Sequence, residues 1–330
     1  MSGYYLAARQ LEFFKGRNGS RPNTDSLADA LAIAQHHDAV TGTEKQHVAY
    51  DYAKRLSVGY NEAENVVASS LACLTDSKSS IGCGDSSTNF QQCPLLNITY
   101  CPASETDLSH GKNLIVVIYN SLGWKREDVV RFPVVNEDVI VLDGQIELML
   151  HRRLLLDDSR GVAEALNETD CIPGDCRGLT DGDNWMSSHT PTFSGIDASY
   201  NLPDNVALIT LQELEGGKVL LRLAHLYEIG EDSVLSVMTR VELKKLFPGK
   251  KIAKVTEMSL SANQEREEME KKRLVWEVEG EANKNPKVVR GSQVDPKKLD
   301  VELAPMEIRT FVIEFEFDLM TDAFKKMIDV

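Results

Sequence analysis

Residues 24–43 read TDSLADALAIAQHHDAVTGT and indicate a helical N-terminal region. The apolar residues of this stretch recur at steps of three and four, which is the spacing of one helical face. They are Leu27, Ala30, Leu31 and Ala34. Thr24, Asp25 or Ser26 can cap the start of the helix, and Gly42 can end it. We therefore expect one helix that runs to near Gly42 and carries two histidines and an aspartate in its last turns.

Two further helices are expected on either side of this stretch. Residues 4–14 have apolar side chains at helical spacing, and the glycine-rich segment 16–23 ends that pattern. Thr43 to Gln46, TEKQ, has the form of a capping box and predicts the start of another helix. Residues 48–74 then continue an apolar stripe at steps of three and four. The sequence predicts a three-helix bundle over residues 1–75.

The second half of the chain has the pattern of an antiparallel β protein. Residues 76–110 are rich in serine, cysteine and proline and are expected to form a disulfide-rich linker. Residues 111–330 are expected to form the β-sandwich region, and two glycines at 216–217 predict a hairpin. Strands are expected within 113–120, 128–135, 206–214, 218–228, 235–243, 252–260, 273–279 and 301–317. The predicted class is α+β, a three-helix bundle followed by an antiparallel β-sandwich.

Composition limits the class of partner. The chain has 330 residues, of which 42% are hydrophobic, which is enough for two domains with cores of their own. Its formal net charge of −15 argues against binding to nucleic acid, which requires clustered lysine and arginine. The longest apolar runs are shorter than the 18 residues that a membrane-spanning helix needs, so we expect no membrane span.

Six cysteines and three glycosylation sequons favour the secretory pathway. The sequons are at Asn18, Asn97 and Asn167. The spacing of the cysteines predicts three disulfides, Cys93–Cys101, Cys171–Cys176 and Cys73–Cys83. The first residues lack a signal-peptide pattern, so we expect the N-terminus to be truncated. The alternative is a cytosolic protein with six free thiols.

The pair His36 and His37, followed by Asp38, is the first candidate for a functional site. Successive helical residues point about 100° apart, so within one helix both histidines cannot easily bind one ion. We expect one to face a site while the other packs or hydrogen-bonds. A helix C-terminus carries partial negative charge and would favour a cation there. The alternative is that the two histidines cap exposed carbonyl groups, because a metal site needs three or four ligands.

The stretch SLADALAIAQHHDAVTGT resembles the class II α-mannosidases, glycoside hydrolase family 38, and is nearest to their lysosomal or vacuolar acid branch. The resemblance continues through NLIVVIYNSLGWKREDVVRFPV, MLHRRLLLDDSRGVAEALNET, VALITLQELEGGKVLLRLAHLYEIGED and VELAPMEIRTFVIE. It implies zinc-dependent, retaining hydrolysis of terminal α-mannose in N-glycans. In that family two histidines and two aspartates hold the zinc. The resemblance implies His37 as one zinc ligand and Asp38 as a contact to sugar hydroxyls.

The resemblance also implies what lies elsewhere. The family carries its nucleophile, its general acid and the other zinc ligands on a β/α barrel before the bundle, so no catalytic carboxyl group is assigned in this chain. A barrel-containing chain of the same enzyme is then an expected partner, alongside mannose-containing oligosaccharides. Two internal segments of the family are expected to be missing, near residues 141–144 and near 176–181. The expected location is the vacuole, the lysosome or the extracellular space.

Arg153 is the remaining site candidate, within HRRLLLDDSRG at 151–161. Its guanidinium could hold sugar hydroxyls, or it could belong to a structural network of arginine and aspartate. Two alternatives to an enzyme remain open for the whole chain. One is a non-catalytic, β-rich module that binds glycans or a partner chain, and the other is a truncated gene product.

Overall fold

A computed structural model describes residues 1–17, 22–76, 90–93, 101–105, 114–125, 133–135, 189–190, 192–274, 290–295 and 297–316. The chain divides into two compact units. The first comprises Met1–Ser87, Val117–Glu127 and Ser188–Val330, and the second comprises Thr88–Val116 and Asp128–Ser187. The predicted boundaries at residues 75 and 110 stay a prediction.

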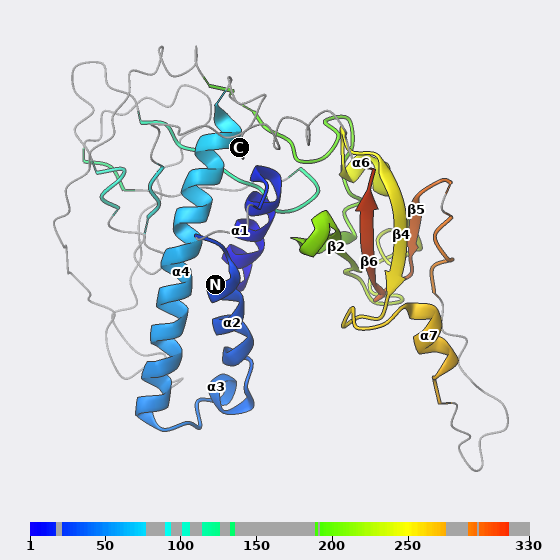
Figure 1. Cartoon of the computed structure of the whole chain (residues 1–330), viewed down its shortest axis with the longest axis horizontal. Helices are drawn as coiled ribbons and strands as arrows, with labels where there is room; N and C mark the ends of the chain where they lie inside the picture. The colour runs from blue at the N-terminus through cyan, green and yellow to red at the C-terminus, as the bar shows by residue number, and fades with distance from the viewer. Residues whose placement is uncertain are drawn as a thin grey trace, which may run out of the picture. The chain divides into compact units, whose positions relative to one another are not determined.

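The N-terminal region is helical, as predicted, but it contains four helices among the described residues. They are α1 Ser2–Lys15, α2 Asp25–Ala34, α3 His37–Thr41 and α4 Gln46–Thr75. Figure 1 shows the short α3 at the turn between α2 and the long α4. The helices pack through Ala8 of α1, Leu27 of α2 and Ala63 of α4, all fully buried. Gly59 of α4 lies against the backbone of Leu27, where an added Cβ would come within 2.6 Å of its Cα.

Two predictions about helix ends are wrong. The expected continuous helix breaks after Ala34, because His36 has an extended backbone with φ −55° and ψ 139° and a new helix begins at His37. The predicted capping box does not form at Thr43. The residue before α4 is Lys45, which makes no side-chain capping bond, and the Thr43 hydroxyl donates instead to Asp38.

A polar cluster joins α1 to the start of α2. Arg9 donates to the Thr24 hydroxyl at 2.7 Å, and Thr24 donates to Glu12 at 2.7 Å. Arg17 pairs with Asp25 at the edge of the cluster. Burial raises the pKa of Asp25, but the hydrogen bonds from Arg17 and then Arg9 outweigh it, so the pKa lies below its ordinary value.

The main sheet has four antiparallel strands in the order β1-β2-β6-β4. Figure 1 labels β2, β6 and β4 of this sheet. Their bounds are β1 Val206–Glu213, β2 Val219–His225, β4 Ile252–Met258 and β6 Ile308–Phe315. The predicted hairpin joins β1 and β2 through the turn η1 Glu215–Gly217. Gly216 has φ 74° and Gly217 has φ 72°, a left-handed conformation that glycine adopts without steric cost. The glycine pair therefore determines this turn.

A second sheet pairs β3 Thr239–Glu242 with β5 Asp300–Leu303, again antiparallel. Val241 and Val301 from this sheet belong to the same buried cluster as Leu221 of β2 and Phe311 of β6. The two sheets thus share one apolar core, which is the arrangement of a β-sandwich. Short helices α6 Leu243–Leu246 and α7 Arg266–Lys271 follow β3 and β4.

Other predicted strands fare unevenly. Residues 301–317 contain two strands, β5 and β6, rather than one. No strand is assigned within the described residues 114–125, although 113–120 was expected to form one. This segment makes polar contacts with α1 instead. The Tyr119 hydroxyl donates to the side-chain oxygen of Gln10, and the Gln10 side-chain nitrogen donates to the Ser121 carbonyl. Most of the expected strand at 128–135 and most of that at 273–279 lie outside the described residues, and no strand is assigned at 133–135.

A buried arginine closes one end of the sandwich. The side chain of Arg309 on β6 is fully buried and makes a bidentate pair with Glu257 on β4, at 2.9 and 2.6 Å. Its remaining nitrogen donates to the carbonyls of Ser292 and Glu302 at 2.8 and 2.7 Å. Arg266 of α7 also pairs with Glu257. The guanidinium of Arg309 thus connects β6 to Glu257, Ser292 and Glu302, which lie in three other segments of the chain.

The described cysteines agree with an oxidised protein. Cys93 and Cys101 form a disulfide, the pairing that their spacing predicts, and Cys73 is also disulfide-bonded. Cys83, Cys171 and Cys176 lie outside the described residues. So do the sequon asparagines Asn18, Asn97 and Asn167, whose glycosylation remains a prediction.

Candidate metal centre

The histidine cluster lies where two helices meet. The helix α2 ends at Ala34, His36 is extended, and α3 starts at His37, so His37 and Asp38 occupy the first turn of a five-residue helix. We expected them in the last turn of a longer helix. The argument from the negative end of a helix does not apply to His37 and Asp38, which lie in the first turn of α3, although His36 follows the end of α2.

The side chains of His36, His37 and Asp38 converge. One ligand atom from each lies within 4.8 Å of the others. The Nε2 of His36 is 3.2 Å from Oδ2 of Asp38, and the Nε2 of His37 is 3.4 Å from Oδ1. The two rings are 4.2 Å apart between centroids. The expectation that both histidines cannot easily bind one ion held only for two residues of one helix, and it does not apply here, since His36 has an extended backbone.

Threonine hydroxyls hold the carboxylate in place. Thr43 donates to Oδ1 of Asp38 at 3.0 Å, and the hydroxyls of Thr41 and Thr43 lie 2.9 Å apart. Thr41 also donates to the His37 carbonyl at 2.6 Å. Gly42, with φ 68° and ψ 30°, adopts the left-handed turn that brings Thr43 back toward Asp38. The turn at Gly42 thus places the Thr43 hydroxyl beside Asp38.

The donor set suits zinc. Two imidazole nitrogens and one carboxylate oxygen are ligands that zinc accepts, and the three groups are accessible, with 81% of the His37 side chain exposed, 47% of His36 and 44% of Asp38. An ion or a sugar can therefore reach His37. Three donors leave at least one position of a tetrahedral ion for another ligand.

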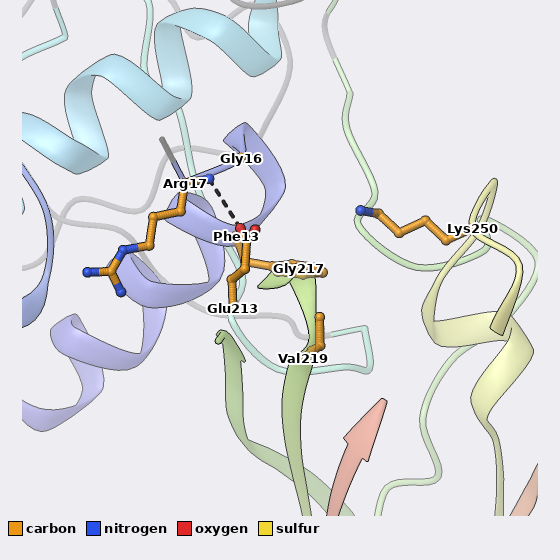
Figure 2. A pocket seen from close by; sticks show the side chains of 7 residues that line it. All are labelled: Phe13, Gly16, Arg17, Glu213, Gly217, Val219 and Lys250. Carbon is orange, nitrogen blue, oxygen red and sulfur yellow. Dashed lines mark hydrogen bonds between the residues drawn. The ribbon is translucent and has the colours of Figure 1, made fainter. Parts of the chain in front are cut away.

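A second feature is a cavity of about 270 Å³ near the end of α1. Figure 2 shows the backbone N–H of Arg17 donating to Glu213, at 3.2 Å, while the guanidinium points away from that carboxylate. The cations that line this cavity already have partners. Arg17 pairs with Asp25, and the Lys250 ammonium lies 5.4 Å from the ring centroids of Phe13 and Phe315. The cavity offers no comparable donor set.

Sequence reasoning identified two of the converging residues and missed the others. It named His37 and Asp38, but assigned His36 a supporting role and used Thr43 as a helix cap. The spacing of Thr43 from Asp38 around Gly42 could have indicated the returning turn. Arg153 lies outside the described residues, so its contact with a sugar stays a prediction. Trp124 packs against the sandwich core.

Two parts of the chain match known domain families. Residues 1–74, which contain the cluster, match the α-mannosidase middle domain. Residues 205–311 match the C-terminal β-sandwich domain of the family 38 glycosyl hydrolases. Among the helices that the structure describes, none is both long enough and apolar enough to cross a lipid bilayer.

The similar full-length proteins are α-mannosidases of plants and lysosomes. The chain is 33% identical to α-mannosidase At3g26720 of Arabidopsis thaliana over 633 residues, which cover 96% of this chain and 62% of the relative. It is 43% identical to the lysosomal α-mannosidase of Felis catus over 135 residues, or 41% of this chain and 12% of the relative.

The chain thus spans less than two thirds of the Arabidopsis relative. The aligned span of 633 residues also exceeds the 330 residues of the chain, so the relative carries internal segments without a counterpart here. The predicted joins near 141–144 and 176–181 lie outside the described residues. The two domain matches and the matched relatives point to one family. The chain belongs to glycoside hydrolase family 38, the α-mannosidase family.

Proposed function

We propose that this chain forms part of a zinc-dependent α-mannosidase that removes terminal α-mannose from N-glycans with retention of configuration. The observation that supports this is the convergence of His36, His37 and Asp38 on an accessible surface, within the segment that matches the α-mannosidase middle domain. The names of the relatives, α-mannosidase, support hydrolysis of α-mannosides.

The chain's own residues would bind and orient. His37 presents an exposed imidazole nitrogen as a zinc ligand. When bound, zinc would hold adjacent hydroxyls of the terminal mannose and so fix the sugar for attack. Asp38 would accept hydrogen bonds from those hydroxyls, and Thr43 would keep its carboxylate turned toward the ion by donating to Oδ1.

Retaining hydrolysis also needs a nucleophilic carboxylate and an acid/base carboxyl group about 5–5.5 Å apart. Within the described residues, the only carboxylate grouped with the two histidines is Asp38. We therefore propose that a β/α barrel, carried by another polypeptide segment, supplies these groups and completes the zinc site. The compartment would be the lysosome or vacuole, where the Cys93–Cys101 disulfide could form and persist on the secretory route.

The test is an activity measurement on the chain alone and with a partner. The partner is the part of Arabidopsis At3g26720 that lies outside the aligned span, and the substrate is 4-nitrophenyl α-mannoside at acid pH with added zinc. We expect no turnover by the chain alone and zinc-dependent turnover by the pair. His37→Ala should abolish the turnover of the pair, whereas His47→Ala, at an exposed histidine of α4, should leave it unchanged.

Three results would contradict the proposal in different ways. Zinc-dependent turnover by the chain alone would show that it holds its own catalytic carboxyl groups. Full turnover by the pair carrying His37→Ala would refute the assignment of His37 as a zinc ligand. Failure of the two polypeptides to associate or to gain activity would refute the idea of a completing partner.

A further inference from the structure

We propose that one end of the β-sandwich, formed by residues 226–238 and 306–308, is a docking surface for the polypeptide that carries the β/α barrel. This surface is apolar and bears acidic side chains, so it fits a partner segment in which lysine or arginine stands beside apolar residues. The inference rests on the proposed function for the existence of the partner, whereas the surface itself consists of described residues of this chain.

Large apolar side chains that face solvent are concentrated at this end of the sandwich. Of the twenty that the described residues expose, seven belong to this surface: Leu226, Ile229, Val234, Val237, Met238, Met306 and Ile308. Its two parts are adjacent, because the backbone N–H of Met306 donates to the Tyr227 carbonyl at 3.0 Å. Single exposed apolar residues are ordinary on a protein surface, but a group of this size at one place marks an interaction site.

Hydrogen bonds hold the loop between β2 and β3 in one conformation. The buried ring of His225 donates through Nε2 to the Val237 carbonyl at 2.9 Å, and its Nδ1 accepts the backbone N–H of Tyr227 at 3.2 Å. Within the loop, the Asp232 carboxylate accepts the two backbone N–H groups of residues 234–235, at 2.7 and 2.8 Å. Because the loop is already ordered, a partner would bind it with little loss of backbone entropy.

The backbone is strained at Met306, in the middle of the turn before β6. Its φ is 63°, in the left-handed region that a residue with a Cβ adopts at an energetic cost, yet 63% of the residue is exposed. Strain of this kind is concentrated at functional sites. Methionine at this position also adapts its shape to an apolar partner, which glycine, the unstrained choice, would not do. The strain therefore favours a use for this side chain in binding.

The charges of the surface determine which partner fits. Glu228, Glu231 and Asp232 lie in the loop, and residues 223–239 contain neither lysine nor arginine. Among the residues that the structure describes, none forms a salt bridge with these three carboxylates. A second copy of the chain fits poorly, because a two-fold contact would bring the same three negative charges together. A partner segment with lysine or arginine neutralises them instead.

The test is binding of the whole chain to the part of Arabidopsis At3g26720 that lies outside the aligned span, measured by isothermal titration calorimetry. Ile229→Ser and Val234→Ser should each weaken binding by about tenfold, the effect of truncating an apolar residue in the centre of an interface. Val58→Ser, at a residue of α4 that is 56% exposed, is the matched control and should bind as the unaltered chain does.

The acidic side chains are tested by charge reversal and by cross-linking. Glu228→Lys should weaken binding, whereas Glu215→Lys, in the exposed turn between β1 and β2, should not. Added salt should weaken the binding of the unaltered chain, because it screens the attraction between the partners. A carbodiimide, which joins carboxylates to lysine amines in contact, should couple Glu228, Glu231 or Asp232 to a lysine of the partner, as mass spectrometry of the peptides would show.

The outcomes separate this inference from the proposed function. Unchanged binding by both Ile229→Ser and Val234→Ser, or cross-links from these carboxylates only to a second copy of the chain, would overturn the docking surface and leave the proposed function intact. Binding that depends on this surface but gives no zinc-dependent turnover would contradict the proposed function and leave the docking surface in place. Absence of any binding would overturn both.

Discussion

Replacing Arg309 by methionine should destabilise the sandwich by about 3–5 kcal/mol, the usual cost of removing one partner of a buried ion pair. The guanidinium is fully buried and gives two nitrogens to Glu257 and a third to two carbonyl groups. Methionine fills a similar volume but leaves Glu257 with Arg266 alone and both carbonyls without a donor. An orphaned buried polar group costs about 1–3 kcal/mol, so the loss cannot be recovered by packing alone.

Urea unfolding followed by tryptophan fluorescence measures this loss, because Trp124 packs against the sandwich core. The matched control is Arg240→Met on β3, whose side chain is 59% exposed and pairs with Asp300. That change should cost no more than about 1 kcal/mol. Adding Glu257→Met to Arg309→Met should restore part of the stability, since the uncompensated carboxylate is removed. Equal losses for Arg309→Met and Arg240→Met would refute the structural role given to the buried network.

Three other predictions concern the helices. Gly59→Ala should destabilise the α2–α4 contact by about 1–3 kcal/mol, because its Cβ would meet the Leu27 backbone, whereas Gly3→Ala meets nothing within 4 Å; thermal unfolding by circular dichroism compares them. The lowered pKa of Asp25 means that its contribution to stability is present above about pH 4 and is lost as the pH falls through the lower folded value. In Asp25→Asn, the free energy of unfolding should therefore fall less steeply at acid pH. An unchanged acid dependence would exclude the pair of Asp25 with Arg17 as its cause. Thr43→Val should lower the zinc-dependent turnover of the pair by about tenfold, because Asp38 loses the donor that orients it, and unchanged turnover would exclude that positioning role.

Local pattern was enough to predict much of the fold. The apolar spacing around Leu27 and along 48–74 located α2 and α4, and the glycine pair at 216–217 located the hairpin. Each of these features depends on residues that are close in sequence. The break at His36 was missed because neither glycine nor proline occurs between Leu27 and Gly42, so nothing local ended the helix before it.

Long-range contacts could not be predicted in the same way. Glu257 and Arg309 are 52 residues apart, and only the pairing of β4 with β6 brings them together. The candidate site was predicted in part. The motif identified His37 and Asp38, but the convergence of His36 with them depends on backbone angles at His36 that the sequence does not reveal. An apolar run bounded by turn residues also favoured a strand at 113–120, but the polar contacts of this segment are made with α1.

The most direct test of the central claim is an anomalous difference map at the zinc absorption edge, from crystals of the chain with its partner, grown with zinc. We predict one peak within bonding distance of the His37 ring. A zinc ion bound elsewhere, with the His37 ring free in solvent, would contradict the account.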